Sequence, residues 1–142
     1  MFIGLQAAGK SSFFKQRFFD SHVRVSLDLL KTRHREQRML DVCFATKQPL
    51  VVDNTNPTEV DRARYISQSR DNGFRVVGFY FRSLASDCLC RNAARSKRVP
   101  DVAILSTVKK LEIPKFSEGF DELNYVQLCV GEFRVEEWLD EI

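Results

Sequence analysis

Apolar and polar positions follow one another along this chain in a pattern that predicts strands and helices in alternation. Apolar or alternating runs of strand length lie at 2–3, 22–27, 50–53, 74–81 and 125–130. Helical patterns lie between and after them, at 11–19, 29–46, 56–72, 86–96, 101–111 and 132–142. Such repetition is typical of an α/β fold, a parallel sheet with helices on both faces. We expect a five-stranded parallel sheet.

Capping and breaking residues set several expected boundaries. Asn56 is expected to N-cap the third helix, with Pro57 at its first position and Glu59 three residues after the cap. Gly73 should end that helix. Strand 2–3 is unusually short, because buried parallel strands normally run to about five residues. We therefore expect the first strand to be a stub.

Residues 4–11 form a motif whose chemistry is specific. They fit the pattern G-x-x-x-x-G-K-[ST] of the phosphate-binding P-loop without a mismatch. Inward-pointing backbone N–H groups of such a loop solvate a polyphosphate, and the following helix adds its positive N-terminal dipole. Lys10 should reach the β- and γ-phosphates, and the Ser11 hydroxyl should ligate Mg²⁺. We therefore expect ATP and Mg²⁺ as cofactors, bound by Gly4, Leu5, Gln6, Ala7, Ala8, Gly9, Lys10, Ser11 and Ser12.

Two carboxylates follow predicted strands at the edge that carries the P-loop. Asp28 comes directly after strand 22–27, and functional residues of open α/β sheets gather at the carboxyl ends of strands. Asp28 could accept a proton from a hydroxyl that attacks the γ-phosphate, or it could simply N-cap the next helix. Its position favours neither role. Asp53 closes the apolar run 50–53, the pattern by which P-loop enzymes present a carboxylate to the magnesium shell.

Basic side chains recur at helical spacing in two places. A stripe on helix 29–46 either holds acceptor phosphates or forms a solvated face, and its members are Lys31, Arg35 and Arg38. Arg91 and Arg95 follow the fourth strand, and Arg98 extends their stripe if the helix continues that far. Arginines at this place can fold over a bound nucleotide as a lid, or they can serve surface solubility. The expected lid covers residues 91 to 110.

Composition and charge limit the class of protein. The chain has 142 residues with 44% hydrophobic content, which is enough for one domain with a sizeable core. Residues 1–100 carry 18 basic and 9 acidic side chains (+9), whereas residues 101–142 carry 4 and 10 (−6), so an anionic ligand belongs with the first part. The sequence has no run of eighteen apolar residues and no signal peptide, which predicts a cytoplasmic protein outside the membrane. The cysteines lack a zinc spacing and suit reduced thiols.

Several blocks of the sequence resemble the kinase domain of polynucleotide 5′-hydroxyl kinases, and the likeness extends over nearly the whole chain. Besides the P-loop and the strand that ends at Asp28, the matching blocks are Val51-Val52-Asp53-Asn54-Thr55-Asn56-Pro57, Arg62-Ala63-Arg64-Tyr65, Arg91-Asn92-x-x-Arg95 and Glu118-Gly119-Phe120. Small bacterial P-loop ATPase/kinase proteins share the block around Asp53. The resemblance implies a P-loop NTPase fold of the nucleotide-kinase type, with the strand order 2-3-1-4-5 and with residues 1–142 as a single kinase domain.

The resemblance also implies a role for each matching residue. Asp28 would be the general base that activates the attacking hydroxyl, and the catalytic set would be Lys10, Asp28 and Arg95. Arg91 and Arg95 would contact the nucleotide phosphates from the lid. The metal ligands would be Ser11 and Asp53. The acceptor would be bound by Lys31, Asp53, Asn54 and Asn56, and either Asp53 or Asn54 would take the acidic role of the family.

These features predict an ATP- and Mg²⁺-dependent kinase that transfers the γ-phosphoryl group to a hydroxyl acceptor, foremost a nucleic-acid 5′-OH. Phage and mammalian enzymes have an arginine where this chain has Lys31, and a lysine cannot make the bidentate phosphate contact. The chain lacks a D-x-D-x-T phosphatase motif and a forkhead-associated domain, so we expect kinase activity only, with no obligate protein partner. The alternatives are a kinase of nucleoside, sugar or antibiotic hydroxyls and an ATP-binding switch with little turnover. An intact Asp28 argues against the switch.

Overall fold

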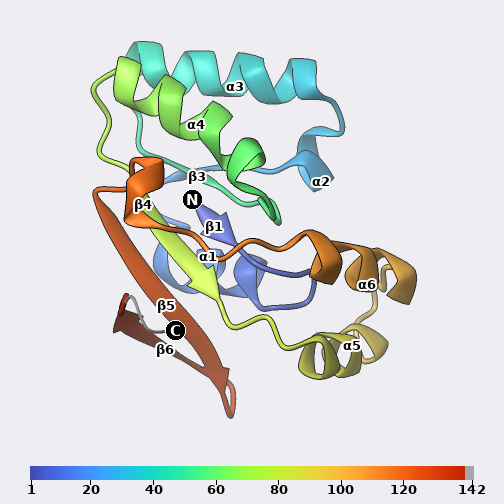
Figure 1. Ribbon diagram of the computed structural model, residues 1–142. Helices are drawn as coiled ribbons and strands as arrows, with labels where there is room; N and C mark the ends of the chain where they lie inside the picture. Colours follow the sequence, from blue (N-terminus) through green and yellow to red (C-terminus); the bar gives the residue numbers. More distant parts are fainter. Residues whose placement is uncertain (140–142) are drawn as a thin grey trace.

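Strands and helices alternate along the computed structural model, which describes residues 1–139 (Figure 1). In chain order the elements are β1 (Phe2–Ile3), α1 (Lys10–Arg17), β2 (Val23–Val25), α2 (Leu27–Leu30), α3 (Arg33–Thr46), β3 (Leu50–Val52), α4 (Glu59–Asp71), β4 (Val77–Phe81), α5 (Ala85–Ala93), α6 (Asp101–Lys110), the 3₁₀ turn η1 (Phe116–Glu118), β5 (Glu122–Cys129) and β6 (Glu132–Glu137). The α/β class is confirmed, and β1 is the two-residue stub that the sequence predicts.

The strands form two hydrogen-bonded ladders, so the prediction of one five-stranded parallel sheet is wrong. A four-stranded sheet has the order β1-β4-β5-β6, and β2 pairs with β3 in a separate ladder. A single parallel bridge between Phe2 and Asp53 links the two. The physical reason is the length of β1, which is too short to extend a ladder along β3. Strands β1 to β5 nevertheless all pair in parallel with one another, and therefore their carboxyl ends lie along one edge. Only β6 is antiparallel to its neighbour, β5, among the strands of residues 1–139.

Strand β6 stands where the sequence analysis predicts a closing helix over 132–142. Cys129 pairs with Glu132 across a two-residue turn, Val130-Gly131, whose residues have φ angles of 44° and 79°. Turns with two positive φ angles match the twist of hairpin strands. The alternation of Phe133 and Val135 with charged residues then puts both apolar side chains against the core, which is the period of a strand. The end of the predicted helix, residues 140–142, lies outside the described residues.

The helix predicted over 29–46 is divided at Lys31. The backbone of Lys31 has a φ of 71°, which ends α2. Thr32 then N-caps α3, because its hydroxyl accepts a hydrogen bond from the Arg35 backbone N–H at 3.1 Å. Lys31 therefore does not share a helix face with Arg35 and Arg38, and the predicted basic stripe is wrong at its first member.

The start of α4 also differs from the prediction, because Asn56 is not its N-cap. Thr58 caps the helix in a reciprocal capping box with Asp61. Asn56 has a φ of 45° and a buried side chain, whose amide donates to the Phe2 carbonyl at 2.8 Å. Asn56 thus ties the segment after β3 to β1. The other end of α4 agrees with the prediction, since the helix stops before Gly73, at a φ of 76°.

Helices cover both faces of the strands, as predicted. Phe2 and Phe81 face α1 in one apolar cluster, whereas their neighbours Ile3 and Tyr80 pack on the side of α4. Figure 1 shows α3 and α4 side by side and α5 next to α6 beyond the carboxyl end of β4. Within residues 1–139, none of the helices combines the length and the apolar character needed to cross a membrane.

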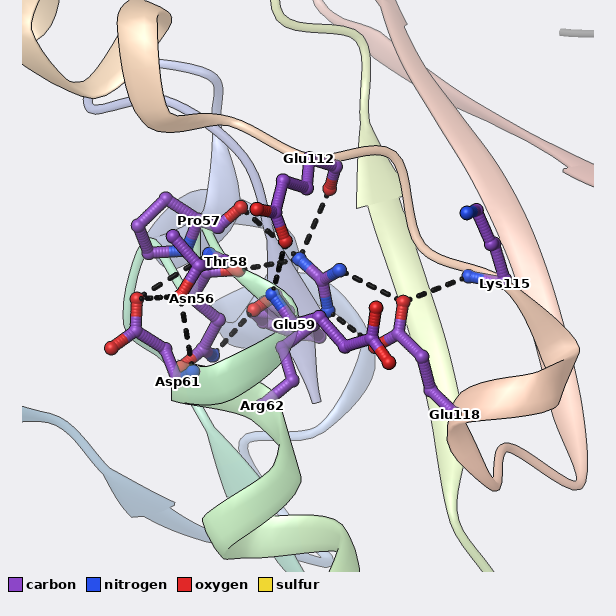
Figure 2. Close-up of polar contacts among 10 residues, drawn as sticks. Asn56, Pro57, Thr58, Glu59, Asp61, Arg62, Glu112, Lys115 and Glu118 are labelled. Atoms are coloured by element: carbon purple, nitrogen blue, oxygen red, sulfur yellow. Dashed lines mark hydrogen bonds and ion pairs between the residues drawn. The ribbon is translucent and has the colours of Figure 1, made fainter.

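Arg62 of α4 is fully buried and joins three segments of the chain (Figure 2). Its guanidinium donates two hydrogen bonds to the Glu118 carboxylate, at 2.7 and 2.8 Å. Its Nη1 also donates to the carbonyls of Asn56, Pro57 and Glu112, at 3.1, 3.2 and 3.0 Å. A buried guanidinium needs such a complete set of acceptors. The cluster fixes the segment that follows Asp53 to the chain that leaves α6.

Candidate nucleotide site

The P-loop connects β1 to α1 and lies against two other elements so closely that it needs glycine. Gly4 has a φ of 153°, and a Cβ atom there would lie 3.0 Å from the Phe81 Cβ. Gly9 has a φ of 99°, and a Cβ atom there would lie 3.0 Å from the Phe133 ring. The Gly4 N–H donates to the Thr55 carbonyl at 3.0 Å. The loop is therefore held between β4, β6 and the segment after β3.

Lys10 begins α1 and turns its side chain back into the P-loop. Its ammonium group donates to the Gly4 carbonyl at 3.0 Å and to the Leu5 carbonyl. Burial lowers the pKa of Lys10 to about 8, and the negative charge of Asp53 opposes this effect in part. A phosphate in the loop would supply the counter-charge that carbonyl groups lack. The arrangement suits a lysine that exchanges carbonyl partners for phosphate oxygens.

Ser11 and Asp53 meet where the sequence predicts the metal ligands. The Ser11 hydroxyl donates to Asp53 Oδ2 at 3.2 Å. These are hard oxygen donors, and Mg²⁺ usually takes one or two protein carboxylates beside phosphates and water. The residues present therefore fit this metal. Over residues 1–139, no three His, Cys, Asp or Glu side chains come together as a metal site by themselves.

Arg24 of β2 contacts both of these residues, and the sequence analysis did not single it out. Its Nε donates to Asp53 Oδ2 at 2.7 Å, and its Nη2 donates to Ser11 Oγ at 3.1 Å. The Asp53 side chain is 2% exposed, whereas that of Arg24 is 28% exposed. The only sequence signal for Arg24 is that it is the polar member of an alternating strand.

Asp28 lies in the first turn of α2, at the same edge of the strands as the P-loop. The N-cap of α2 is Ser26. The alternative that Asp28 serves as the N-cap is therefore wrong. Its side chain is exposed at the site, where a carboxylate can meet an acceptor molecule.

A polar network holds α2 in place. Asn54 accepts a hydrogen bond from the Leu27 backbone N–H at 2.9 Å and donates to Glu36 Oε2 at 3.1 Å. The buried Glu36 also accepts from the Tyr65 hydroxyl at 3.0 Å and from Arg33 at 2.9 Å. Burial and the Glu36 carboxylate raise the pKa of Tyr65, which keeps its hydroxyl protonated. Asn54 thereby fixes the residue that precedes Asp28.

Arg91 and Arg95 reach the site from α5 and from the turn that follows it. Arg91 Nε donates to the Ala7 carbonyl of the P-loop at 2.7 Å. Helix α5 ends at Ala93, so Arg95 lies beyond the helix, and the predicted stripe does not continue to Arg98. Helix α6 packs in the same apolar cluster as the P-loop, through fully buried Ile104.

These elements surround a cavity of about 260 Å³ at the carboxyl edge of the strands. The predicted residues that line it are Gln6, Ala7, Gly9, Lys10, Ser11, Ser12, Asp28, Asp53, Asn54, Arg91 and Arg95. Thr55, Val99 and Leu128 complete the lining and were not predicted, because their approach depends on tertiary structure. The other three predicted residues of the P-loop, Gly4, Leu5 and Ala8, are buried and do not line the cavity. Lys31 and Asn56, predicted to bind the acceptor, do not line the cavity.

A second cavity of about 260 Å³ lies at the amino ends of the strands and contains none of the predicted residues. Its lining includes Met1, His22, Leu50 and Val77. These residues begin or precede β1 to β4, so this cavity is on the opposite edge from the P-loop. The chemical groups of the predicted site gather only at the carboxyl edge.

Comparison with known proteins gives a family match over most of the chain. The AAA domain family model matches residues 1–114. A bifunctional polynucleotide phosphatase/kinase of Schizosaccharomyces pombe is 24% identical over an alignment of 138 residues, and the match covers 92% of this chain and 34% of that protein. A protein of Acanthamoeba polyphaga mimivirus with the same two activities in its name is 25% identical over an alignment of 133 residues, and that match covers 87% of this chain and 32% of the mimivirus protein. The chain thus spans about a third of the length of these relatives.

A solved structure confirms the fold class. A gluconokinase of Sinorhizobium meliloti 1021 superposes with a TM-score of 0.61 at 16% sequence identity, and the match covers 89% of this chain and 79% of that one. At this identity the likeness shows the fold alone, which is that of a P-loop kinase. The resemblance to polynucleotide kinases that the sequence predicts is confirmed by the family match and by the curated relatives.

Proposed function

We propose, from the premise that the chain belongs to the AAA domain family, that it transfers the γ-phosphoryl group of ATP to a polynucleotide 5′-hydroxyl. One observation carries the proposal: a complete P-loop, the Asp28 carboxylate and the guanidinium groups of Arg91 and Arg95 border one cavity. Binding of nucleotide needs no base. Phosphoryl transfer to a hydroxyl does. The acceptor is suggested by the curated relatives, both of which are named for polynucleotides.

In this proposal the P-loop and the lid bind the triphosphate. Lys10 leaves the carbonyls of Gly4 and Leu5 and donates to the β- and γ-phosphates, while Arg91 and Arg95 neutralise charge on the transferring group. Ser11 and Asp53 would hold Mg²⁺, which supplies further charge neutralisation at the phosphate oxygens when it is bound. The lid, within residues 91–110, would close over the nucleotide and exclude water.

Asp28 acts as the general base in the same proposal. Its carboxylate takes the proton of the acceptor hydroxyl as the hydroxyl oxygen bonds to the γ-phosphorus and the bond from that phosphorus to the β–γ bridging oxygen breaks. The hydrogen bond from Leu27 to Asn54 keeps α2, and with it Asp28, beside the cavity. This step divides the work of the site, because Asp28 serves the acceptor and the P-loop serves the nucleotide.

A small-molecule kinase is the second candidate, and the position of Lys31 favours it. Lys31, expected to hold a backbone phosphate of a nucleic acid, lies in the turn between α2 and α3 and does not line the cavity. The structural neighbour, in turn, is named for a small-molecule acceptor. In this case the P-loop, Asp28 and the lid keep their roles, and only the acceptor differs.

Incubation with γ-labelled ATP, Mg²⁺ and a panel of acceptors tests the proposal. The panel contains DNA and RNA oligonucleotides with 5′-OH ends, the same oligonucleotides with 5′-phosphate ends, nucleosides and sugars. We expect label on the 5′-OH oligonucleotides and none on their 5′-phosphorylated controls. Label on nucleosides or sugars alone would support the second candidate, and hydrolysis without transfer to any acceptor would contradict both.

A further inference from the structure

The guanidinium of Arg24 occupies the space between the two expected metal ligands. It donates to Asp53 Oδ2 at 2.7 Å and to Ser11 Oγ at 3.1 Å, and these two oxygens lie 3.2 Å apart. All three groups therefore form one closed set of contacts. Asp53 Oδ2 is shared by both donors, which leaves this oxygen with little capacity for another cation.

The burial of Asp53 explains why the site needs a cation at all times. The side chain is 2% exposed, and a buried carboxylate is unfavourable unless it has a charged or hydrogen-bonding partner. Arg24 supplies that partner in the structure. Mg²⁺ at the same oxygens would bring two positive charges next to the guanidinium, which is unfavourable at such short range. Arg24 and Mg²⁺ therefore compete for Asp53.

We propose that Arg24 is a built-in counter-cation that sets the metal dependence of nucleotide binding. It occupies Ser11 and Asp53 until Mg²⁺ arrives together with a nucleoside triphosphate, whose phosphates supply further ligands. The guanidinium then moves away from the metal toward solvent, which its partly exposed side chain allows. This inference rests on the proposed function, because it takes the P-loop to bind a metal–nucleotide complex. Its consequence is that Mg²⁺ alone binds weakly.

A purely structural ion pair makes a different prediction. If Arg24 and Asp53 only stabilise the fold and stay paired when nucleotide binds, removing the guanidinium should destabilise the protein, and Mg²⁺ should not restore the loss. Competition predicts that Mg²⁺ takes over the vacated place. The response to the metal alone therefore separates the two explanations without any measurement of activity.

Melting temperatures in MgCl₂ and in NaCl of equal ionic strength provide the first test. The wild-type protein should respond equally to both salts. Arg24→Gln should melt lower in NaCl and recover by about 3 to 6 °C in MgCl₂ at ten to a hundred times the metal Kd, since ligand binding stabilises by mass action. Arg75→Gln, which removes an exposed arginine from its pair with Glu122, is the matched control and should show no Mg²⁺-specific recovery.

Two further variants keep the test decisive if Arg24→Gln folds poorly. Arg24→Lys keeps the positive charge without the two-point contact, and its Mg²⁺ response should lie between those of wild type and Arg24→Gln. The double variant Arg24→Gln with Asp53→Asn removes both charges and should lose the Mg²⁺ response. An Mg²⁺ response equal to that of the wild type in all Arg24 variants would overturn the proposal.

Calorimetric binding of a non-hydrolysable ATP analogue, with Mg²⁺ and with EDTA, provides the second test. The Kd measured in EDTA divided by the Kd measured with Mg²⁺ tells how much the metal aids nucleotide binding. We expect this ratio to be at least tenfold larger in Arg24→Gln than in the wild type, and equal ratios would contradict the role of Arg24. Absence of analogue binding to the wild type would instead contradict the proposed function, while the melting comparison still decides on Arg24.

Discussion

The side chain of Lys10 must change partners for the proposed reaction to occur. In the structure its ammonium group contacts the carbonyls of Gly4 and Leu5. Burial lowers its pKa to about 8, so its positive charge is less favourable here than in water. A triphosphate in the loop offers the charge that makes this burial favourable. The burial of the Lys10 charge, which is unfavourable by itself, would therefore become favourable when a triphosphate binds.

Lys10→Ala is expected to abolish phosphoryl transfer and to weaken ATP binding by about 10- to 100-fold, because a hydrogen bond to a charged group contributes roughly 1.5 to 3 kcal/mol. Calorimetry and transfer of γ-label measure the two effects. Lys15→Ala, an exposed lysine on the same helix, is the matched control and should change neither. Unchanged turnover in Lys10→Ala would show that the P-loop assignment is wrong.

Site residues could be predicted from the sequence where a local pattern marks them. They could not be predicted where their role depends on contacts between elements that are distant in the sequence. Asp28 and Asp53 could be predicted to share an edge with the P-loop, because each follows an apolar or alternating run and parallel strands end together. Arg24 could not. It is one polar position of a three-residue strand, and its contacts to Ser11 and Asp53 depend on how β2, β3 and α1 are arranged.

Between elements, the connection through Arg62 determines how the segment after β3 is held (Figure 2). The pair with Glu118 is almost wholly shielded from water, at 0% and 3% side-chain exposure. Its remaining donors contact backbone carbonyls from two other segments. Such a pair is costly to break from one side only, because the remaining charge stays buried without a partner.

Arg62→Met is expected to lower the free energy of unfolding by about 3 to 5 kcal/mol, which urea unfolding measures. Adding Glu118→Met should recover part of the loss, because it removes the carboxylate left unpaired. The exposed Arg75–Glu122 pair is the control, and Arg75→Gln should cost under about 1 kcal/mol. A loss in Arg62→Met as small as in Arg75→Gln would mean that the cluster is not structurally important.

The proposed reaction requires the lid, residues 91–110, to move. Arg95 and the turn between α5 and α6 are exposed, whereas Asn92 and Ile104 on either side are fully buried. We expect hydrogen exchange in residues 94–100 to be fast without nucleotide and at least tenfold slower with an ATP analogue, while β4 changes little. Protection of this turn equal to that of β4, with or without nucleotide, would rule out a lid.

The boundaries of helices and strands could be predicted where one local sequence signal dominates. The predictions are wrong where two local signals favour different structures. Gly73 ends α4 as expected, since glycine readily adopts its φ of 76°. For β6, acidic composition suggested a helix, but the turn at Val130-Gly131 and the alternation of Phe133 with Val135 produce a strand. The division of α2 from α3 at Lys31 could not be seen in a periodicity that continues across it.

In the molecule as a whole, two short ladders present their chemistry along one edge. Within residues 1–139, the strands of the two ladders pair only at the bridge between Phe2 and Asp53, and this bridge sets the P-loop beside Asp53. The Asp53 N–H in turn donates to the Val25 carbonyl at 2.8 Å, which sets Asp53 beside β2. The order in which the parallel strands neighbour one another, β2-β3-β1-β4-β5, agrees with the order that the resemblance to kinases implies. The sheet is interrupted between β1 and β3 because β1 has only two residues. The short β1 could be predicted from the sequence, but the division into two ladders could not.

The proposed division of roles is that Asp28 acts on the acceptor while the P-loop acts on the nucleotide. Its most direct test is kcat with the best acceptor, measured with an ATP binding isotherm, for the wild type, Asp28→Asn and the exposed control Asp20→Asn. Asparagine keeps the size of the side chain but cannot take the proton. If Asp28 is the base, kcat should fall by about 10²- to 10⁴-fold in Asp28→Asn, with ATP affinity unchanged within about twofold and no effect in the control. A loss in kcat below about threefold, under about 1 kcal/mol of barrier, would contradict this division of roles.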